Sequence, residues 1–423
     1  MTLTSIFLEV ARRVDGAALV GSAIGSDPRL LPERFHLLCA GKAAFPMLRG
    51  LLGAIGAERI AGGLVVSPAT RLVAPPDLPK TVVCLSSDHP DPSSRSVAAG
   101  HAACDRLEAL RPSENLVVLL SGGASSALAV PANGLCLDDK RTTSRAVARA
   151  GAGITELNSV RKHLSAIKGG QLGLRARVPT VVLALSDVLG NDPSTIASGP
   201  FSPDPTSFGQ ALAVVERLAP TAPARAVAHL QKGAAGHTPE TPKPGDPRLR
   251  HVAFRLIAGP ERVVEDAQRV VLGRGLCFDV LSAGTESSVD DLALAYGRRA
   301  QREAISPTPG RVLVGNGEPS IVVRGTGHGG RATHLALAVA HEIRGLARVT
   351  FLAAGTDDRD GSTQASGAAV DGTTWARAEA SGLDPAGALA RFDSEPPLRA
   401  LGCLVHGPGT SNLLDLHLLG IGV

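Results

Sequence analysis

The sequence predicts an α/β protein of two domains, from its length, its apolar runs and the segments between those runs. At 423 residues the chain is long enough for two or three domains with sizeable cores. Helical patterns fill the gaps between short Val- and Leu-rich runs, and continuous apolar runs are typical of parallel strands that helices cover on both faces. The clearest runs lie at residues 36–41, 81–88, 115–123 and 180–187.

A stretch rich in proline and glycine at residues 231–250 marks the predicted domain boundary. Neither a helix nor a central strand tolerates that many prolines. We therefore predict domains at residues 1–240 and 241–423, facing each other across a cleft. The second part repeats the alternation of strands and helices. Its expected strands lie at 254–259, 278–284, 311–317, 320–325 and 349–357, and its expected helices at 261–272, 290–303 and 331–346.

Composition and charge exclude several classes of protein. Hydrophobic residues make up 44% of the chain, which argues against disorder, and the net charge of +4 is not gathered in a basic stripe. With only 3% aromatic residues, a nucleic-acid binder is not expected. The six cysteines are widely spaced, so reduced thiols are expected. The N-terminus lacks the pattern of a signal peptide, and polar residues interrupt the uncharged stretch at 115–137, so we expect a soluble, cytoplasmic protein.

Two polar loops follow predicted strands, which is where open α/β sheets bind ligands. Lys42 opens a helix, so its ammonium and the backbone N–H groups of that helix would face the same anion. The glycine loop at Ser121, Gly122, Gly123 and Ser125 can approach a phosphate closely, although it lacks the spacing of a Walker loop. A solvated lysine and a plain strand-to-helix turn are the alternatives.

A second glycine-rich segment, at residues 325–330, matches GxGxxG. It stands between a predicted strand and the helix that opens at Arg331, so Gly327, Gly329 and Gly330 are predicted to bind the phosphates of a cofactor. Arg331 at the exit of this loop suggests that a side chain also holds the anion. A glycine turn that packs a helix on a strand is the alternative.

A basic segment at residues 156–170 supplies candidate substrate-binding residues, namely Asn158, Arg161 and Lys162. The Arg161 guanidinium can fork onto a carboxylate or phosphate, and at helical spacing Arg161 shares a face with Lys168. We expect Arg161 to lie nearer the ligand than Lys162. A solvated basic helix face is the alternative.

Two carboxylates, Asp187 and Asp192, follow a buried strand and are candidate Mg²⁺ ligands. Mg²⁺ keeps its waters and takes further ligands from phosphates, so two carboxylates suffice. Helix capping is the alternative for Asp192, because Pro193 fits the first position of a helix. Several such loops, mixing glycine amides with Lys, Arg and Asp, together predict a large polyanionic ligand with a metal.

With these motifs the chain resembles the class II glycerate kinases, the glycerate 2-kinase family with a C-terminal MOFRL domain, whose members are sometimes labelled hydroxypyruvate reductases. The resemblance implies two α/β domains, the first with a Rossmann-like parallel sheet, and transfer of phosphate from ATP, with Mg²⁺, to the 2-hydroxyl of D-glycerate. It places the catalytic roles on Lys42 and Arg331. The segments that carry it run from about residue 40 to residue 415 and read AGKAA, SSDHPDP, LLSGGASSAL, ELNSVRKHLSAIKGGQL, LALSDVLGNDPSTIASGPFSPDPT, TPKPGD, GHGGRATHLALA, AAGTDDRDG and HGPGTSN.

The function predicted from the sequence is therefore an ATP-dependent glycerate 2-kinase that gives 2-phosphoglycerate and ADP. Two alternatives stay open. One is an NAD(P)H-dependent hydroxypyruvate reductase that uses the GxGxxG segment, and the other is a metabolite-binding regulatory protein without turnover. The expected partners are the small molecules D-glycerate and ATP, with no nucleic acid and no membrane. The sequence leaves open whether the chain forms a homo-oligomer.

Overall fold

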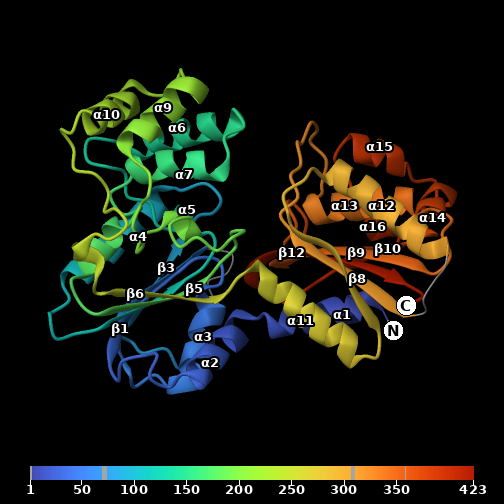
Figure 1. The fold of residues 1–423 in the computed structure, drawn as a ribbon, viewed down its shortest axis with the longest axis horizontal. Helices are drawn as coiled ribbons and strands as arrows, with labels where there is room; N and C mark the ends of the chain where they lie inside the picture. Colours follow the sequence, from blue (N-terminus) through green and yellow to red (C-terminus); the bar gives the residue numbers. More distant parts are fainter. Residues whose placement is uncertain (1, 69–73, 306–309, 358) are drawn as a thin grey trace. The chain divides into compact units, whose positions relative to one another are not determined.

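The computed structural model describes residues 2–68, 74–305, 310–357 and 359–423. The chain divides into two compact units, one of residues 20–257 (the first unit) and one of residues 1–19 with 258–423 (the second unit) (Figure 1). The domain limits of 1–240 and 241–423 stay a prediction. The chain changes unit after the proline-rich stretch, at the end of a strand that belongs to the first sheet.

The first unit is built on a six-stranded sheet whose central strands are buried, parallel and formed by apolar runs. The sheet order is β3-β2-β1-β4-β5-β6, the order of a doubly wound Rossmann sheet. The chain fills one side of β1 and then crosses to β4, so the direction of winding reverses between these two strands. The strands are β1 (Phe35–Ala40), β2 (Ile60–Pro68), β3 (Val82–Ser87), β4 (Leu116–Leu120), β5 (Thr180–Leu185) and β6 (Val252–Ala258).

Helices cover both faces of this sheet, as the sequence predicts. Helix α3 lies on one face, and α4 packs on the other face together with α8 (Figure 1). Helices α6, α7, α9 and α10 form a separate apolar cluster of their own, built around residues such as Val160 and Phe208. The helices are α2 (Gly16–Ser26), α3 (Ala44–Ile55), α4 (Ser94–Glu108), α5 (Ala124–Ala127), α6 (Leu137–Arg149), α7 (Ile154–His163), α8 (Gln171–Ala176), α9 (Phe208–Leu218) and α10 (Ala224–Ala234), with short 3₁₀ turns η2 (Ile196–Ser198) and η3 (Pro247–Leu249).

The second unit is also α/β, but its six-stranded sheet is mixed. Its order is β11-β10-β9-β12-β8-β7, with antiparallel pairs except for the parallel pair β7 and β8. The strands are β7 (Cys277–Thr285), β8 (Arg311–Gly317), β9 (Val349–Asp357), β10 (Gly367–Asp371), β11 (Leu404–Val405) and β12 (Thr410–Ile421).

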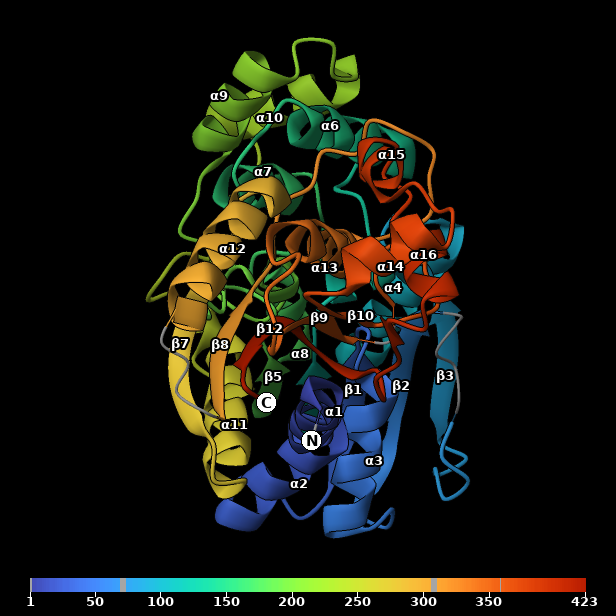
Figure 2. The same cartoon turned by 90° about the vertical axis from the view of Figure 1, so that its right-hand side faces the viewer.

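Helices α12 and α13 cover one face of the second sheet, and α1 and α11 cover the other (Figures 1 and 2). The N-terminal helix thus packs in the second unit, where Glu9 pairs with Arg274 at 2.7 Å. The helices are α1 (Leu3–Arg13), α11 (Pro260–Gly273), α12 (Val289–Ile305), α13 (Arg331–Glu342), α14 (Thr374–Ala380), α15 (Pro385–Ala390) and α16 (Glu395–Ala400).

Two predictions for the second part of the chain are wrong. The run at 254–259 does not begin a second sheet, because most of it forms β6 at the edge of the first one. The run at 320–325 is not a strand, since Ser320 makes a single bridge to Ser288 and the residues after it are irregular. Both flanks of the neighbouring strand β8 are occupied, by β12 and β7, so no edge is available there for another strand.

A buried ion pair joins α7 to the segment before α9. Lys162 Nζ lies 3.0 Å from Asp204 Oδ1, and both side chains are almost fully buried. The Asp204 carboxylate also accepts hydrogen bonds from the Thr206 amide and hydroxyl and from the Thr241 hydroxyl. These donors satisfy the carboxylate, so the pair is a structural link within the first unit.

We predict that Asp204→Ala lowers the free energy of unfolding of the first unit by about 3–5 kcal/mol, because it leaves the Lys162 ammonium buried without a counter-charge. Urea unfolding followed by circular dichroism measures this. The matched control is Glu108→Ala, which removes the exposed partner of Arg175 and should change the free energy by about 1 kcal/mol or less. Equal, small effects of the two variants would contradict the structural role of the pair.

Candidate functional site

The loops that follow β1 and β4 pack closely and are hydrogen-bonded to each other, at the point where the winding of the first sheet reverses. Gly41 has φ +120°, and a Cβ atom built there would lie 2.3 Å from Ser121 Oγ, so no larger residue fits. The Lys42 amide donates to the Gly122 carbonyl at 2.9 Å, and the Ala43 amide donates to Ser121 Oγ at 3.0 Å. In doubly wound folds this reversal is where ligands bind.

These contacts correct one expectation about Lys42. A helix, α3, does follow it, but the helix begins at Ala44 rather than at Lys42. The amides of Lys42 and Ala43 already have acceptors in the loop after β4, and the Ala44 amide points to the Gly41 carbonyl. The amides of Lys42, Ala43 and Ala44 are therefore not available to an anion. The side chain of Lys42 is half-buried at this position.

The predicted glycine loop is a tight turn into the short helix α5. Gly123 has φ +82°, and an added Cβ atom would lie 3.0 Å from Lys42 Cγ and 3.1 Å from His89 Cδ2. Ser121 is fully buried, and its hydroxyl serves as the acceptor for α3. The loop thus brings a glycine backbone against the Lys42 side chain, at the carboxyl end of β4.

A small cationic pocket of about 100 Å³ adjoins this loop. Lys140 from α6, Arg161 from α7 and Lys168 line it together with Ser125. Lys168 Nζ donates to the Ser125 carbonyl at 2.6 Å and to its hydroxyl at 2.8 Å. Lys140 Nζ donates to the Arg161 carbonyl at 3.4 Å.

Three cations of this pocket, Lys140, Arg161 and Lys168, have no acidic partner among the described residues, whereas Arg141 and Arg145 in the same lining are paired. Lys140 is 4% and Lys168 is 2% exposed, and neither forms an ion pair within the described part of the chain. Asp91 is the one carboxylate in the lining, and it pairs with Arg145 at 2.8 Å. Buried charges normally have a counter-charge, so this pocket fits an anion that comes from outside the chain.

Burial and mutual repulsion weaken these bases. Burial, with a contribution from Arg161, lowers the pKa of Lys140 to about 7. Burial, followed by the charges of Lys140 and Arg161, lowers the pKa of Lys168 well below its usual range. Burial also lowers the pKa of Arg161. An anion in the pocket would favour the charged forms of these bases. The protein would therefore take up protons when the anion binds.

The residues predicted from the basic segment have different positions. Arg161 lines the pocket, and Asn158 lies behind it, where its Oδ1 accepts from the Ser198 hydroxyl, which in turn meets the Ser125 hydroxyl at 2.8 Å. Lys162 is held in its ion pair with Asp204, away from the pocket lining. The predicted shared helix face of Arg161 and Lys168 is wrong, because α7 ends at His163, but both side chains reach the same pocket.

Sequence reasoning missed Lys140, because the search followed strand ends and Lys140 lies inside a helix. The buried positions of α6 include Lys140, Thr143 and Val147, which have the spacing of one helix face. Their burial is seen only in the folded chain, so the sequence carried no clear signal for Lys140.

The two predicted metal ligands differ in their surroundings. Asp192 Oδ1 accepts from the Ser194 amide and Oδ2 from the Ser194 hydroxyl, both at 2.8 Å, so Asp192 forms the local turn. Asp187 follows the carboxyl end of β5, next to β4 in the sheet. Within residues 2–68, 74–305, 310–357 and 359–423, no three His, Cys, Asp or Glu side chains gather closely enough to hold a metal ion.

The glycine-rich segment before α13, in the second unit, packs against protein rather than opening toward a ligand. A Cβ atom added at Gly327 would meet Asp393 at 2.6 Å, and one at Gly329 would meet Ser394 Oγ at 2.4 Å. One added at Gly330 would meet Asp360 Oδ1 at 2.1 Å. These glycines are therefore required for close packing inside the unit.

Asp360 occupies the start of α13. Its carboxylate accepts from the Ala332 amide at 3.0 Å and from the Thr333 amide at 2.7 Å, the groups that a dinucleotide phosphate would use. No strand leads directly into the segment either. A GxGxxG dinucleotide site needs a strand directly before the glycines and helix amides that are available to the phosphates, and this segment has neither.

Arg331, the first residue of α13, lies among carboxylates. It forms ion pairs with Glu318 and with Asp415, the latter at 3.5 Å between Nε and Oδ2. Burial raises the pKa of Asp415 to about 7, although the Arg331 charge opposes this rise. The Arg331 side chain is about one-third exposed.

None of the helices in the described part of the chain combines the length and the apolar character that crossing a bilayer requires.

Comparison with known proteins identifies two family models in this chain. The model described as a domain of unknown function, DUF4147, matches residues 2–231, and the model of the MOFRL family matches residues 311–415. A protein of Agrobacterium vitis that bears a provisional hydroxypyruvate reductase name is 34% identical, over 98% of this chain and 94% of its own. The D-glycerate 2-kinase of Thermotoga maritima is 31% identical, over 98% of this chain and 97% of its own.

Solved structures agree with these relatives. The crystal structure of a glycerate kinase from Thermotoga maritima superposes with a TM-score of 0.85 at 29% identity, over 99% of each chain. A protein of Pyrococcus horikoshii superposes with a TM-score of 0.77 at 28% identity, over 100% of this chain and 99% of that one.

We predict that sulfate binds the cationic pocket and that its affinity falls about tenfold between pH 6 and pH 8, as Lys140, with a pKa of about 7, loses its proton. Sulfate stays a dianion over this range, so the change reports the protein. Isothermal titration calorimetry in buffers of different ionisation enthalpy measures both the affinity and the proton uptake. Lys140→Met should weaken binding and remove most of the pH dependence, whereas the exposed control Lys80→Met should change neither.

Proposed function

The chain belongs to the family of glycerate kinases with a C-terminal MOFRL domain, and from that premise we propose that it transfers the γ-phosphoryl group of ATP to the 2-hydroxyl of D-glycerate. The products are 2-phosphoglycerate and ADP. The observation that carries the proposal is the pocket that adjoins the glycine loop at the winding reversal, where Lys140, Arg161 and Lys168 form no ion pair with any described residue. The cationic pocket fits one small anion, and the adjoining glycine loop fits a phosphate chain.

The roles follow from the chemistry of each part. The carboxylate of glycerate enters the cationic pocket, where Arg161 can fork onto its two oxygens and Lys168 and Lys140 add charge. The phosphates of ATP lie along the loop of Ser121–Ser126, where glycine permits a close approach. The 2-hydroxyl is then held near the γ-phosphoryl group, since both parts meet at Ser125.

The reaction itself is a displacement at phosphorus. The 2-hydroxyl oxygen forms a bond to the γ-phosphorus while the bond from that phosphorus to the bridging oxygen breaks, and ADP leaves with the electron pair. The hydroxyl proton passes to solvent. Positioning and neutralisation of charge are what this reaction needs from the protein, and Lys42 supplies a cation at the loop. Arg331 stays the second predicted catalytic cation.

Mg²⁺, when bound, neutralises charge on the β- and γ-phosphate oxygens. The residues present fit this ion in part. We assign Asp187 as its carboxylate, because it stands at the carboxyl end of β5 beside the glycine loop. The Asp192 oxygens are taken by Ser194, so Asp192 shapes the turn instead. One carboxylate is sufficient when substrate phosphates and waters provide the other ligands.

The reductase alternative loses its basis in the geometry. It depended on the GxGxxG segment, whose glycines pack against protein and whose helix amides bind Asp360. One assay tests the proposal: purified protein with ATP, Mg²⁺ and D-glycerate, with the product identified by NMR, beside NADH with hydroxypyruvate. We expect ATP turnover without NADH oxidation. NADH oxidation alone would support the reductase, and glycerate binding without any turnover would support a regulatory protein.

We predict that Lys42→Met and Arg331→Lys each lower kcat by at least about 100-fold, because the first removes a cation that acts on charge in the transition state and the second removes a guanidinium fork that matches the phosphoryl oxygens. Arg331→Lys keeps a positive charge beside the buried carboxylate of Asp415. Steady-state kinetics and the melting temperature separate lost catalysis from lost folding. The exposed control Lys80→Met should retain kcat. A kcat within a few-fold of the unmodified protein would remove that residue from the mechanism.

We further predict that Gly123→Val raises the KM for ATP at least about tenfold while changing the KM for D-glycerate less, because the added side chain would displace Lys42 and obstruct the phosphate loop. Gly134→Val is the matched control. Gly134 has the same φ of +82° but open space around its Cβ position, so it carries the backbone strain without the obstruction. If both variants alter the KM for ATP alike, strain rather than obstruction is responsible.

A further inference from the structure

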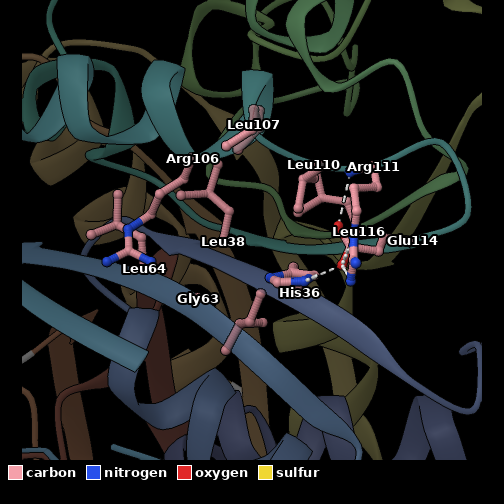
Figure 3. Close-up of a pocket in the computed structure, with 12 residues that line it drawn as sticks. His36, Leu38, Gly63, Leu64, Arg106, Leu107, Leu110, Arg111, Glu114 and Leu116 are labelled. Carbon is pink, nitrogen blue, oxygen red and sulfur yellow. Dashed lines mark hydrogen bonds and ion pairs between the residues drawn. The ribbon is translucent and has the colours of Figure 1, made fainter. Parts of the chain in front are cut away.

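A second pocket of the first unit lies near the amino ends of the strands, whereas the candidate site lies at their carboxyl ends. It has a volume of about 270 Å³ and is walled mainly by leucines. They come from the first half of β1, from β2, from the start of β4 and from the last turn of α4 and the loop after it (Figure 3). The leucines are Leu37, Leu38, Leu64, Leu107, Leu110 and Leu116.

The pocket exists because side chains are missing from one strand and because the covering helix ends. Strand β2 carries glycine at 62 and 63, and Gly62 pairs with His36 in the neighbouring strand. A Cβ atom at Gly62 would lie 3.4 Å from the Thr81 carbonyl oxygen and 3.6 Å from His36 Nδ1, both ordinary contacts, so the glycine leaves a side chain missing beside His36. Helix α4 ends at Glu108, before the amino ends of the strands are covered.

The charged groups at the rim of this pocket differ in whether they have hydrogen-bond partners. Glu114 accepts hydrogen bonds from Arg111 and lies 3.5 Å from His36 Nε2, and the Arg111 hydrogen bonds lower its pKa to about 2. Arg106 also lines the pocket but forms no hydrogen bond or ion pair with any described residue. Figure 3 shows Arg106 and the group of His36, Arg111 and Glu114 on different sides of the leucines.

We propose that this pocket binds a small monocarboxylate with an apolar body. The apolar part enters the leucine-lined space, which removes it from water, and the carboxylate meets the uncommitted guanidinium of Arg106. Glu114 is already neutralised by Arg111, so it does not repel the ligand strongly. The site is separate from the candidate kinase site, since it lies where β1 and β4 begin rather than where they end.

Binding can be tested on the full chain with selectively labelled leucine methyl groups, titrated by NMR with butanoate, pentanoate and hexanoate. We expect shifts at Leu38, Leu64 and Leu110. Affinity should rise about threefold to fourfold for each added methylene, which is the gain from burying one such group. 1-Hexanol should bind about tenfold more weakly than hexanoate, because it lacks the charge. Absence of binding at millimolar concentration, or equal affinity for the acid and the alcohol, would overturn the proposal.

Two variants separate the parts of the pocket. Arg106→Gln should remove the preference for hexanoate over 1-hexanol while alcohol binding persists. Leu110→Trp, at a half-buried rim position, should fill the space and abolish both. The control Arg149→Gln changes an exposed arginine on α6 and should leave both affinities unchanged. If Leu110→Trp does not fold, the Arg106→Gln result still decides, because an unchanged preference would overturn the assignment of the carboxylate.

Discussion

The close approach of the two loops at the winding reversal is the constraint on which the first unit depends. Gly41 leaves room for the Ser121 hydroxyl, which caps the start of α3, and this contact places Lys42 against Gly123. A larger residue at position 41 would meet Ser121, so the two crossovers would have to separate. The cationic pocket depends on the same loop, since Lys168 is bound to the backbone and hydroxyl of Ser125. Binding geometry at this end of the sheet therefore follows from backbone packing as much as from charged side chains.

Much of the first unit could be predicted from the sequence, because its central strands are covered on both faces and so are continuously apolar. Strand β4, for example, is buried at every position. The second unit was harder to predict, because its strands carry polar residues inside the core. Strand β12 includes Asp415 and His417, which are 5% and 0% exposed, and this pattern hides a central strand. Conversely, Val322 and Val323 look like strand residues but are 72% and 61% exposed in an irregular segment.

The residues of the candidate site that follow a strand were predicted from the sequence, whereas the one that lies inside a helix was missed. Lys42 and Ser125 stand next to strand ends, and the pattern of small residues around them reveals the loop. Lys140 could not be found in that way, because only packing shows that its helix face is buried. Lys162 has the same residue type as Lys140 and Lys168, yet the folded chain gives it Asp204 as a partner. Whether a cation is structural or functional depends on the location of the carboxylates, which spacing along the sequence does not give.

The carboxylate of Asp360 at the start of α13 has a consequence for how Arg331 is presented. Hydrogen bonds to Ala332 and Thr333 complete the first turn of the helix from within the unit. The backbone that carries Arg331 is therefore ordered before any ligand arrives, and no conformational entropy need be lost there on binding. Only the side-chain torsions of Arg331 remain to be fixed, and its pairs with Glu318 and Asp415 already restrict them. A guanidinium held in this way is preorganised, so interaction with a phosphoryl group would not be weakened by the ordering of its own loop.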